Sequence, residues 1–352
     1  MQLALLIVLI VFVIDLFVPE GVAASVPHIL GVMATLTSNR RRDPIIVAVL
    51  ATFFTLSAEW FSPGRGDTEL WKVMFNRFLV VTAIWATALV IYLRATAMNE
   101  LARVSKQLKK ELNYASRLQE RLYPKESPKI SGLDIAGFVE PAEQLCGDYY
   151  DYLEMNEKCI GFVIGDVSGH GIGQSIVMSD VRSTLRGMAK SDLSLGEILT
   201  KVNLQLVADT PDDIFVTLML VKVDPESMTF SFASAGHCSL LIRASGECEV
   251  LRSGSLALGL SEHATYSTED DHMFNVGDTL ILATDGLEER HSPEGELFGR
   301  DRILQEVSHA GPCSSEQLIK RLVTSASTFA RGETQHDDIT MVIIRRSSPL
   351  MN

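Results

Sequence analysis

The sequence is short of basic residues and lacks paired cysteines. Its 352 residues include 31 Lys and Arg against 44 Asp and Glu, which gives a formal net charge of −13. Nucleic acid binding requires clustered Lys and Arg, so we do not expect DNA or RNA to be a partner. The five cysteines, an odd number without a C-x-x-C pair, argue against a disulfide framework or a thiolate zinc site and indicate a reducing compartment for residues 94–352.

The charge is also unevenly distributed along the chain. Residues 1–93 contain six basic and six acidic residues, so the whole acidic excess lies in residues 94–352. The mean hydropathy of the chain is nevertheless positive, +0.18. An apolar part joined to an acidic, polar part predicts more than one domain. We expect a membrane segment over 1–93, a connecting helix over 94–123, a polar domain over 124–346 and a tail over 347–352.

Four apolar stretches predict four transmembrane helices, although each is short for the ~20 residues that a span needs. They cover residues 1–18, 22–38, 44–61 and 75–93. Clustered arginines in a short loop stay on the cytoplasmic side, so Arg40, Arg41 and Arg42 place both termini inside. This predicts a multi-pass protein of the inner or cell membrane with a cytoplasmic polar domain. A signal peptide cleaved at Val22-Ala23-Ala24 is disfavoured, because no Lys or Arg precedes the first apolar run.

Residues 94–123 contain no Gly or Pro and are predicted to form one helix. Apolar residues recur there at steps of three and four, at Leu101, Val104, Leu108, Leu112, Ala115, Leu118 and Leu122. This spacing produces one apolar stripe. The stripe is compatible with a parallel two-stranded coiled coil that forms a homodimer, and with a single helix packed on its own domain. Either helix would connect a membrane signal to the polar domain.

From residue 131 onward, short β-type runs alternate with helical runs. Strands are expected at 159–164, 214–223, 228–233, 239–243, 278–283 and 339–345, and helices at 172–190, 194–208, 300–309 and 314–331. Tight turns such as Val223-Asp224-Pro225-Glu226 join several strands. This favours an α+β domain with antiparallel sheets and helices outside them.

Four acidic motifs stand at the ends of these runs. They are Cys146-Gly147-Asp148, then Gly165-Asp166-Val167-Ser168-Gly169-His170-Gly171, then Ala283-Thr284-Asp285-Gly286, and finally Asp337-Asp338-Ile339-Thr340. A buried carboxylate without a partner is costly, so acidic groups that converge at strand ends need a cation. Oxygen ligands without a His or Cys cluster suit Mg²⁺ or Mn²⁺ better than zinc.

At these residues the chain resembles the metal-dependent protein phosphatase (PPM) family, and in particular its bacterial SpoIIE and RsbU branch. The resemblance covers about residues 112–346 and includes the GDVSGHG and ATDGL motifs, Ala235-Gly236-His237, Leu258-Gly259, Glu296-Leu297-Phe298-Gly299 and the closing DDIT. It implies a four-layer sandwich with two antiparallel sheets between helices. It also implies hydrolysis of phosphoserine or phosphothreonine in a protein by a water that bridges two metal ions.

The resemblance also implies roles for particular residues. Asp166 would bridge two Mn²⁺ or Mg²⁺ ions, with the backbone carbonyl of Val167 as a further ligand. Asp285 and Asp337 would hold the first ion and Asp148 the second. Asp338 is an alternative to Asp337, since alternation along a strand lets only one of them face the site.

Two departures from the branch concern single residues. Cys146 stands where the branch usually has Gly, so it would be strained if that position required φ > 0. Ser168 stands where the wider family has a histidine, the family's general acid. His170 is nearby, and its imidazole could either protonate the leaving serine oxygen or support the Gly-rich turn, of which the structural role is favoured. The same two interpretations apply to His237, and the structural one is favoured there as well. Since no arginine near the first motif is suited to bind phosphate, we expect the metals to hold it.

The leading hypothesis is a membrane-anchored protein serine/threonine phosphatase. Its substrate, by resemblance, would be a phosphorylated regulatory protein of the STAS type, an anti-sigma-factor antagonist. The alternative is a pseudophosphatase, a scaffold that binds a partner without turnover. The presence of all the metal-site aspartates argues against that alternative.

Overall fold

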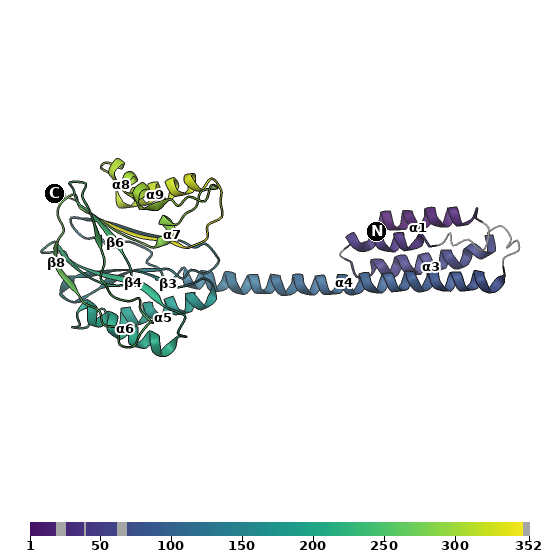
Figure 1. The fold of residues 1–352 in the computed structure, drawn as a ribbon, viewed down its shortest axis with the longest axis horizontal. Helices are drawn as coiled ribbons and strands as arrows, with labels where there is room; N and C mark the ends of the chain where they lie inside the picture. Colours follow the sequence, from purple (N-terminus) through teal and green to yellow (C-terminus); the bar gives the residue numbers. More distant parts are fainter. Residues whose placement is uncertain (19–25, 39, 62–68, 348–352) are drawn as a thin grey trace. The chain divides into compact units, whose positions relative to one another are not determined.

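The computed structural model describes residues 1–18, 26–38, 40–61 and 69–347 and divides the chain into two compact units, Met1–Lys110 and Glu111–Asn352 (Figure 1). The possible cleavage site at Val22-Ala23-Ala24 and most of the expected tail, residues 348–352, lie outside the described residues. All five cysteines are free, as the lack of cysteine pairs predicted.

The described part of the first unit is helical. It contains α1 (Gln2–Asp15), α2 (His28–Met33), the 3-10 helix η1 (Ala34–Thr37), α3 (Asp43–Phe61) and the first part of α4 (Leu70–Gln119). Among the described residues, only α4 is long and apolar enough to cross a membrane, and the other apolar helical stretches, Gln2–Asp15, His28–Thr37 and Asp43–Ala58, are shorter. The 14 residues of α1 reach roughly 21 Å, short of the ~30 Å of hydrocarbon. The prediction of four spanning helices is therefore not supported.

Small side chains fill the interior of this unit and large ones face outward. Its buried cluster consists of Ala4, Val8, Val32, Val47, Ala48, Ala51, Val80, Ile84, Ala88 and Ile91. The exposed side chains include Leu6, Leu9, Phe53, Phe78 and Val90. A water-soluble helical bundle has the opposite arrangement, with its large apolar side chains inside.

Helix α4 continues beyond the apolar run as far as Gln119, so the last predicted span and most of the connecting helix form one element. Its stripe residues Leu101, Val104 and Leu108 are 64%, 53% and 56% exposed. These side chains of the first unit are thus more than half exposed.

The second unit is built around two five-stranded antiparallel sheets. The first has the order β1 (Leu133–Glu140), β10 (Ile339–Arg346), β9 (Thr279–Ala283), β6 (Ser239–Ile242) and β7 (Cys248–Leu251). The second has the order β2 (Tyr149–Glu154), β3 (Ile160–Val167), β4 (Val216–Asp224), β5 (Thr229–Ala235) and β8 (Glu269–Met273). The short helices η2 (Asn156–Lys158) and α7 (Asp285–Glu288) follow β2 and β9.

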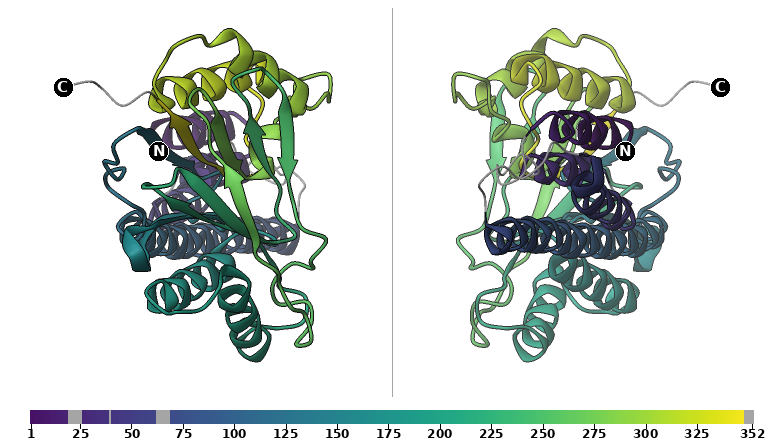
Figure 2. Two further views of the ribbon diagram at one scale, coloured as in Figure 1. Left: turned by 90° about the vertical axis from the view of Figure 1, so that its left-hand side faces the viewer. Right: turned by 90° about the vertical axis from the view of Figure 1, so that its right-hand side faces the viewer.

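Helices cover the outer faces of both sheets. Helices α5 (Ile172–Met188) and α6 (Leu195–Asp209) pack on the second sheet, and α8 (Gly299–His309) and α9 (Ser315–Ala330) on the first (Figures 1 and 2). The starts of α6 and α9 are fixed by capping boxes, in which Ser194 and Ser314 accept a hydrogen bond from the backbone three residues on. The predicted four-layer sandwich is confirmed.

Most residues of the central strand β3 are apolar, because both faces of the strand are buried. In β3, Phe162 and Ile164 face the core between the sheets, whereas Val163 and Val167 pack toward α5 and α6. This alternation places successive residues of one strand in two different cores. The end of such a strand is held from both sides, so it can position a functional side chain.

Candidate active site

The four acidic motifs meet at one edge of the sandwich, with two contributed by each sheet. Asp148 directly precedes β2, and Asp166 lies near the end of β3. Asp285 begins α7 just after β9, and the Asp337-Asp338 pair directly precedes β10. Strand pairing within each sheet brings together the two acidic motifs of that sheet. Contacts between the two sheets then connect the motifs of one sheet with those of the other.

Thr284 makes the clearest of these contacts. Its hydroxyl donates a hydrogen bond of 2.7 Å to Oδ2 of Asp148 and accepts one of 3.0 Å from the backbone N–H of Thr340. Its own N–H donates to the carbonyl of Thr340 at 3.0 Å. One side chain therefore connects the first, third and fourth acidic motifs.

Asp337 and Asp338 have different surroundings. Asp338 is buried, and its two carboxylate oxygens each accept a hydrogen bond of 2.8 Å, one from the N–H of Ala142 and one from that of Gly147. The carboxylate of Asp337 accepts only the N–H of Asp338, at 2.8 Å, among the hydrogen bonds of the described residues. Asp338 thus orders the segment that carries Asp148, whereas Asp337 keeps oxygen lone pairs available.

Two glycines allow the motifs to approach each other. A Cβ added to Gly147 would lie 3.3 Å from the carbonyl oxygen of Val167, and one added to Gly286 would overlap the carbonyl oxygen of Asp338. Cys146 is not among the described residues with positive φ, so the expected condition for strain is not met. Its side chain is fully buried. Close approach is needed at the second position of this motif and not at the first.

The carboxylates raise one another's pKa. Burial, followed by the charges of Asp285 and Asp337, raises the pKa of Asp166 to about 7. Burial and the neighbouring Asp166 raise the pKa of Asp148, while burial, with a contribution from Asp285, raises that of Asp337. These groups are therefore close enough to repel one another, and a bound cation would relieve that repulsion.

The donor set fits hard divalent cations. Its side chains are carboxylates, the Val167 carbonyl lies beside the Asp148 segment, and the mutual repulsion favours positive charge between them. In the described part of the chain, however, no three acidic, His or Cys side chains are spaced to hold an ion by themselves. This agrees with ions that take their remaining ligands from water, as Mg²⁺ usually does.

Beside Asp166 and Asp285 lies a cavity of about 180 Å³. His237 lines it, and both ring nitrogens of this buried histidine are engaged. Nε2 lies 3.0 Å from the carbonyl of Ala283 and Nδ1 lies 3.0 Å from the hydroxyl of Thr217. Since a carbonyl only accepts, Nε2 carries the proton and Nδ1 accepts from Thr217. Burial lowers the pKa of His237 to about 4, so the ring is neutral and has a structural role.

His170 lies in the exposed loop between β3 and α5. Its side chain is 77% exposed, and Nδ1 is 3.3 Å from Oε1 of Glu143. The structure therefore brings Asp148, Asp166, Asp285 and Asp337 together, while the imidazole of His170 faces solvent and Glu143.

Sequence reasoning missed two contributors to the site. The Gln119 amide at the end of α4 binds the backbone of Cys146 twice, accepting its N–H at 3.0 Å and donating to its carbonyl at 2.7 Å. Arg300, the second residue of α8, lines the cavity beside Asp285. Neither could be found from local sequence, because each acts on a residue distant in the chain.

The comparisons with known proteins agree with this geometry. The family described as Stage II sporulation protein E (SpoIIE) matches residues 156–347, more than half of the chain. The chain belongs to the SpoIIE family. A curated member of similar sequence is the phosphoserine phosphatase RsbU of Bacillus subtilis (strain 168), 27% identical over 70% of this chain and 73% of RsbU.

Two solved structures of PP2C domains have the same fold. The SiaA-PP2C domain of Pseudomonas aeruginosa is 21% identical with a TM-score of 0.61, covering 69% of this chain and 99% of that domain. The phosphatase domain of SpoIIE from Bacillus subtilis, with a fragment of its regulatory domain, is 19% identical with a TM-score of 0.54, covering 63% and 65%. At these identities the likeness establishes the PP2C-type fold.

Proposed function

We propose that this SpoIIE-family chain is a metal-dependent protein serine/threonine phosphatase, which hydrolyses phosphoserine or phosphothreonine on a regulatory protein. The observation that carries the proposal is the cluster of Asp148, Asp166, Asp285 and Asp337, which come from two sheets. Burial and the charges of neighbouring carboxylates raise the pKa of Asp148, Asp166 and Asp337. A protein that needed these residues only for folding would gain nothing from such repulsion. RsbU, the relative of similar sequence, is a phosphoserine phosphatase, and this supports assigning the chain to the protein serine/threonine phosphatases.

In this proposal Asp166 would be a ligand shared by two Mg²⁺ or Mn²⁺ ions, with the Val167 carbonyl as a further ligand. Asp285 and Asp337 would hold one ion and Asp148 the other. We assign the ligand role to Asp337, because both oxygens of Asp338 already accept backbone hydrogen bonds. When bound, two such ions lower the pKa of a water and stabilise negative charge on phosphoryl oxygens.

His170 is proposed as the proton donor to the leaving serine oxygen. Its exposed imidazole lies in the loop that directly follows Asp166 and Val167, and its contact with Glu143 is a solvent-exposed pair. Exposed pairs of this kind contribute at most about 1 kcal/mol, so the ring can leave Glu143 at little cost.

We further propose that residues 1–93 attach the enzyme to the inner or cell membrane, with the second unit in the cytoplasm. The inverted packing of the first unit supports this, since small residues inside and large apolar ones outside suit a lipid environment. The uncovered stripe at Leu101, Val104 and Leu108 supports a homodimer through α4. The substrate is proposed to be a STAS-type phosphoprotein, by analogy with RsbU.

The second candidate, a pseudophosphatase, is favoured by one observation, the lack of three described acidic side chains spaced to hold an ion. Hydrolysis of p-nitrophenyl phosphate and of a phosphoserine protein by residues 94–352 separates the two, with Mn²⁺, with EDTA and in the Asp166→Asn variant. We expect turnover that needs metal and is lost in the variant. No turnover, in this fragment or in the full chain in lipid, would favour the pseudophosphatase.

A further inference from the structure

The cavity beside Asp166 and Asp285 has one feature that the metal-site proposal leaves unexplained. Of the described residues that line it, Arg300 is the only Arg or Lys, among three carboxylates. His237 also lines it, and its low pKa keeps it neutral. The cavity thus combines the acidic groups expected of a metal site with a single fixed positive charge.

Arg300 is held at the cavity wall by a partner from the metal-site segment itself. Nε of Arg300 donates to Oε1 of Glu288 at 3.0 Å, and Nη2 donates to Oε2 at 3.4 Å. Glu288 ends α7, the one-turn helix that begins at Asp285. Residues three apart lie on the same side of a helix, so this turn directs both carboxylates to the cavity. The position of Arg300 is thereby tied to that of Asp285.

The pair is accessible to a ligand from the cavity. The side chain of Arg300 is 40% exposed and that of Glu288 is 32% exposed. A guanidinium carries five N–H donors, and among the hydrogen bonds of the described residues those of Arg300 to Glu288 engage only Nε and Nη2, so both protons of Nη1 are available to a ligand. A second anion can therefore bind to Arg300 without first displacing Glu288.

We propose that Arg300 binds the phosphoryl oxygens of the phosphoserine substrate and of the phosphate product. This inference rests on the proposed phosphatase function and assigns the substrate contact that the sequence left to the metals alone. Without a cation the carboxylates of the cavity would repel a phosphate dianion. The guanidinium matches phosphate with two parallel hydrogen bonds, which a metal ion does not provide. Glu288 keeps the side chain in place between turnovers.

The Arg300→Ala variant of the full-length protein in lipid nanodiscs tests this assignment. Inorganic phosphate is titrated calorimetrically into Mg²⁺-loaded protein, and KM and kcat are measured on a phosphoserine peptide. Because charge-assisted hydrogen bonds are lost, we expect phosphate binding to weaken at least about tenfold. KM should rise in parallel, with a smaller change in kcat and an unchanged Mg²⁺ requirement. Arg300→Lys, which retains the charge without the fork, should lie in between.

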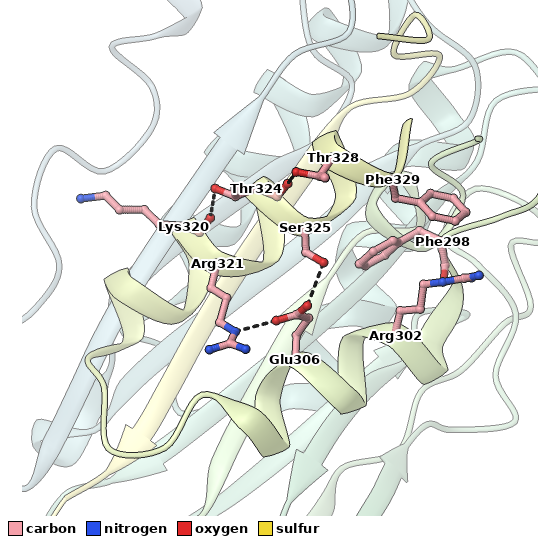
Figure 3. Close-up of a pocket in the computed structure, with 9 residues that line it drawn as sticks. All are labelled: Phe298, Arg302, Glu306, Lys320, Arg321, Thr324, Ser325, Thr328 and Phe329. Atoms are coloured by element: carbon pink, nitrogen blue, oxygen red, sulfur yellow. Dashed lines mark hydrogen bonds and ion pairs between the residues drawn. The ribbon is translucent and has the colours of Figure 1, made fainter. Parts of the chain in front are cut away.

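Arg321→Ala is a matched control. Arg321 of α9 pairs with Glu306 of α8 at 2.5 Å, with side-chain exposures of 43% and 25% close to those of Arg300 and Glu288 (Figure 3). It lines the groove between α8 and α9, away from the acidic motifs. Its loss removes a similar ion pair, so this variant should bind phosphate like the wild type.

The outcomes are distinguishable. Equal phosphate affinities in Arg300→Ala and Arg321→Ala would overturn the assignment, and so would a wild type that binds no phosphate. Phosphate binding that depends on Arg300 in a wild type without turnover would support the binding site and contradict the phosphatase function. A rise in KM that occurs in Arg300→Ala and not in Arg321→Ala supports both the phosphate-binding role of Arg300 and the phosphatase function.

Discussion

Replacing Asp166 by Asn should stabilise the metal-free protein at neutral and alkaline pH, even though it removes the proposed bridging ligand. Burial and the charges of Asp285 and Asp337 raise the pKa of Asp166 from 3.8 to about 7. A carboxyl whose pKa is raised by folding binds its proton more tightly in the folded state. Its contribution to stability therefore falls as the pH rises from about 4 to about 7. Asn carries no charge and avoids this loss.

The size of the effect follows from the shift. A rise in pKa from 3.8 to about 7 corresponds to about 4 kcal/mol of lost stability at pH 8, because each unit is worth about 1.4 kcal/mol. At pH 5 the folded-state carboxyl is still mostly protonated, and the loss is only about 2 kcal/mol. The gain on substitution should thus reach up to about 4 kcal/mol at pH 8 and be roughly half as large at pH 5.

Urea denaturation of residues 94–352 in EDTA at both pH values measures this difference. Asp213→Asn, at an exposed position, is the control and should change little. Excess Mg²⁺ should reverse the ranking, because the ions stabilise the wild type and the variant has lost a ligand. If Asp166→Asn is no more stable than the wild type at pH 8 in EDTA, or gains equally at both pH values, the repulsion inferred between the carboxylates is wrong.

Two further predictions concern the supports of the site. Gln119→Ala leaves the buried N–H and carbonyl of Cys146 without their partner. It should therefore lower the free energy of unfolding in urea by about 1–3 kcal/mol and raise the Mg²⁺ concentration needed for half-maximal activity. An unchanged Mg²⁺ concentration at half-maximal activity would contradict the second effect. Asp151 is fully buried and accepts two hydrogen bonds of 2.6 Å from Arg186. Asp151→Ala should therefore cost about 3 kcal/mol, the low end for a broken buried pair because Arg186 is 45% exposed. Destabilisation no greater than that of Arg186→Ala would contradict the burial argument.

The sequence marks the acidic motifs locally, because three of them combine a strand end with a Gly-Asp or Asp-Gly pattern and the fourth, Asp337-Asp338, directly precedes an apolar strand. The same reasoning predicted the two helices on each face, whose apolar periodicity is local. It missed β1, β2, β7 and β8, which are the four edge strands of the two sheets. The sequence of β8, Glu-Asp-Asp-His-Met, is polar, because an edge strand needs to bury little. It also overstated the membrane spans, since hydropathy located the apolar runs but did not show that α1 ends at Asp15.

The remaining parts of the site depend on contacts between distant residues. Arg300 pairs with Glu288 twelve positions away, Gln119 reaches Cys146, and Thr284 reaches Asp148 across the sandwich. No short motif marks such pairs, because their partners meet only after the sheets have packed. The proposed assignment of Asp337 rather than Asp338 as the metal ligand also depends on the fold. Strand alternation indicates that only one of the two faces the site, but only the structure shows that both carboxylate oxygens of Asp338 accept backbone hydrogen bonds.

The pairing of β1 with β10 determines when the candidate active site can form during synthesis and folding of the chain. Leu133 lies opposite Arg346, and Glu140 lies opposite Ile339, so β1 joins its sheet only through the last strand. A growing chain makes the apolar helices first, then Asp148 and Asp166, and only near the end Asp337 and β10. Long-range pairing of this kind is a late event in folding. The proposed active site therefore cannot be complete until Asp337 and β10 have been made, well after the residues of α1–α4.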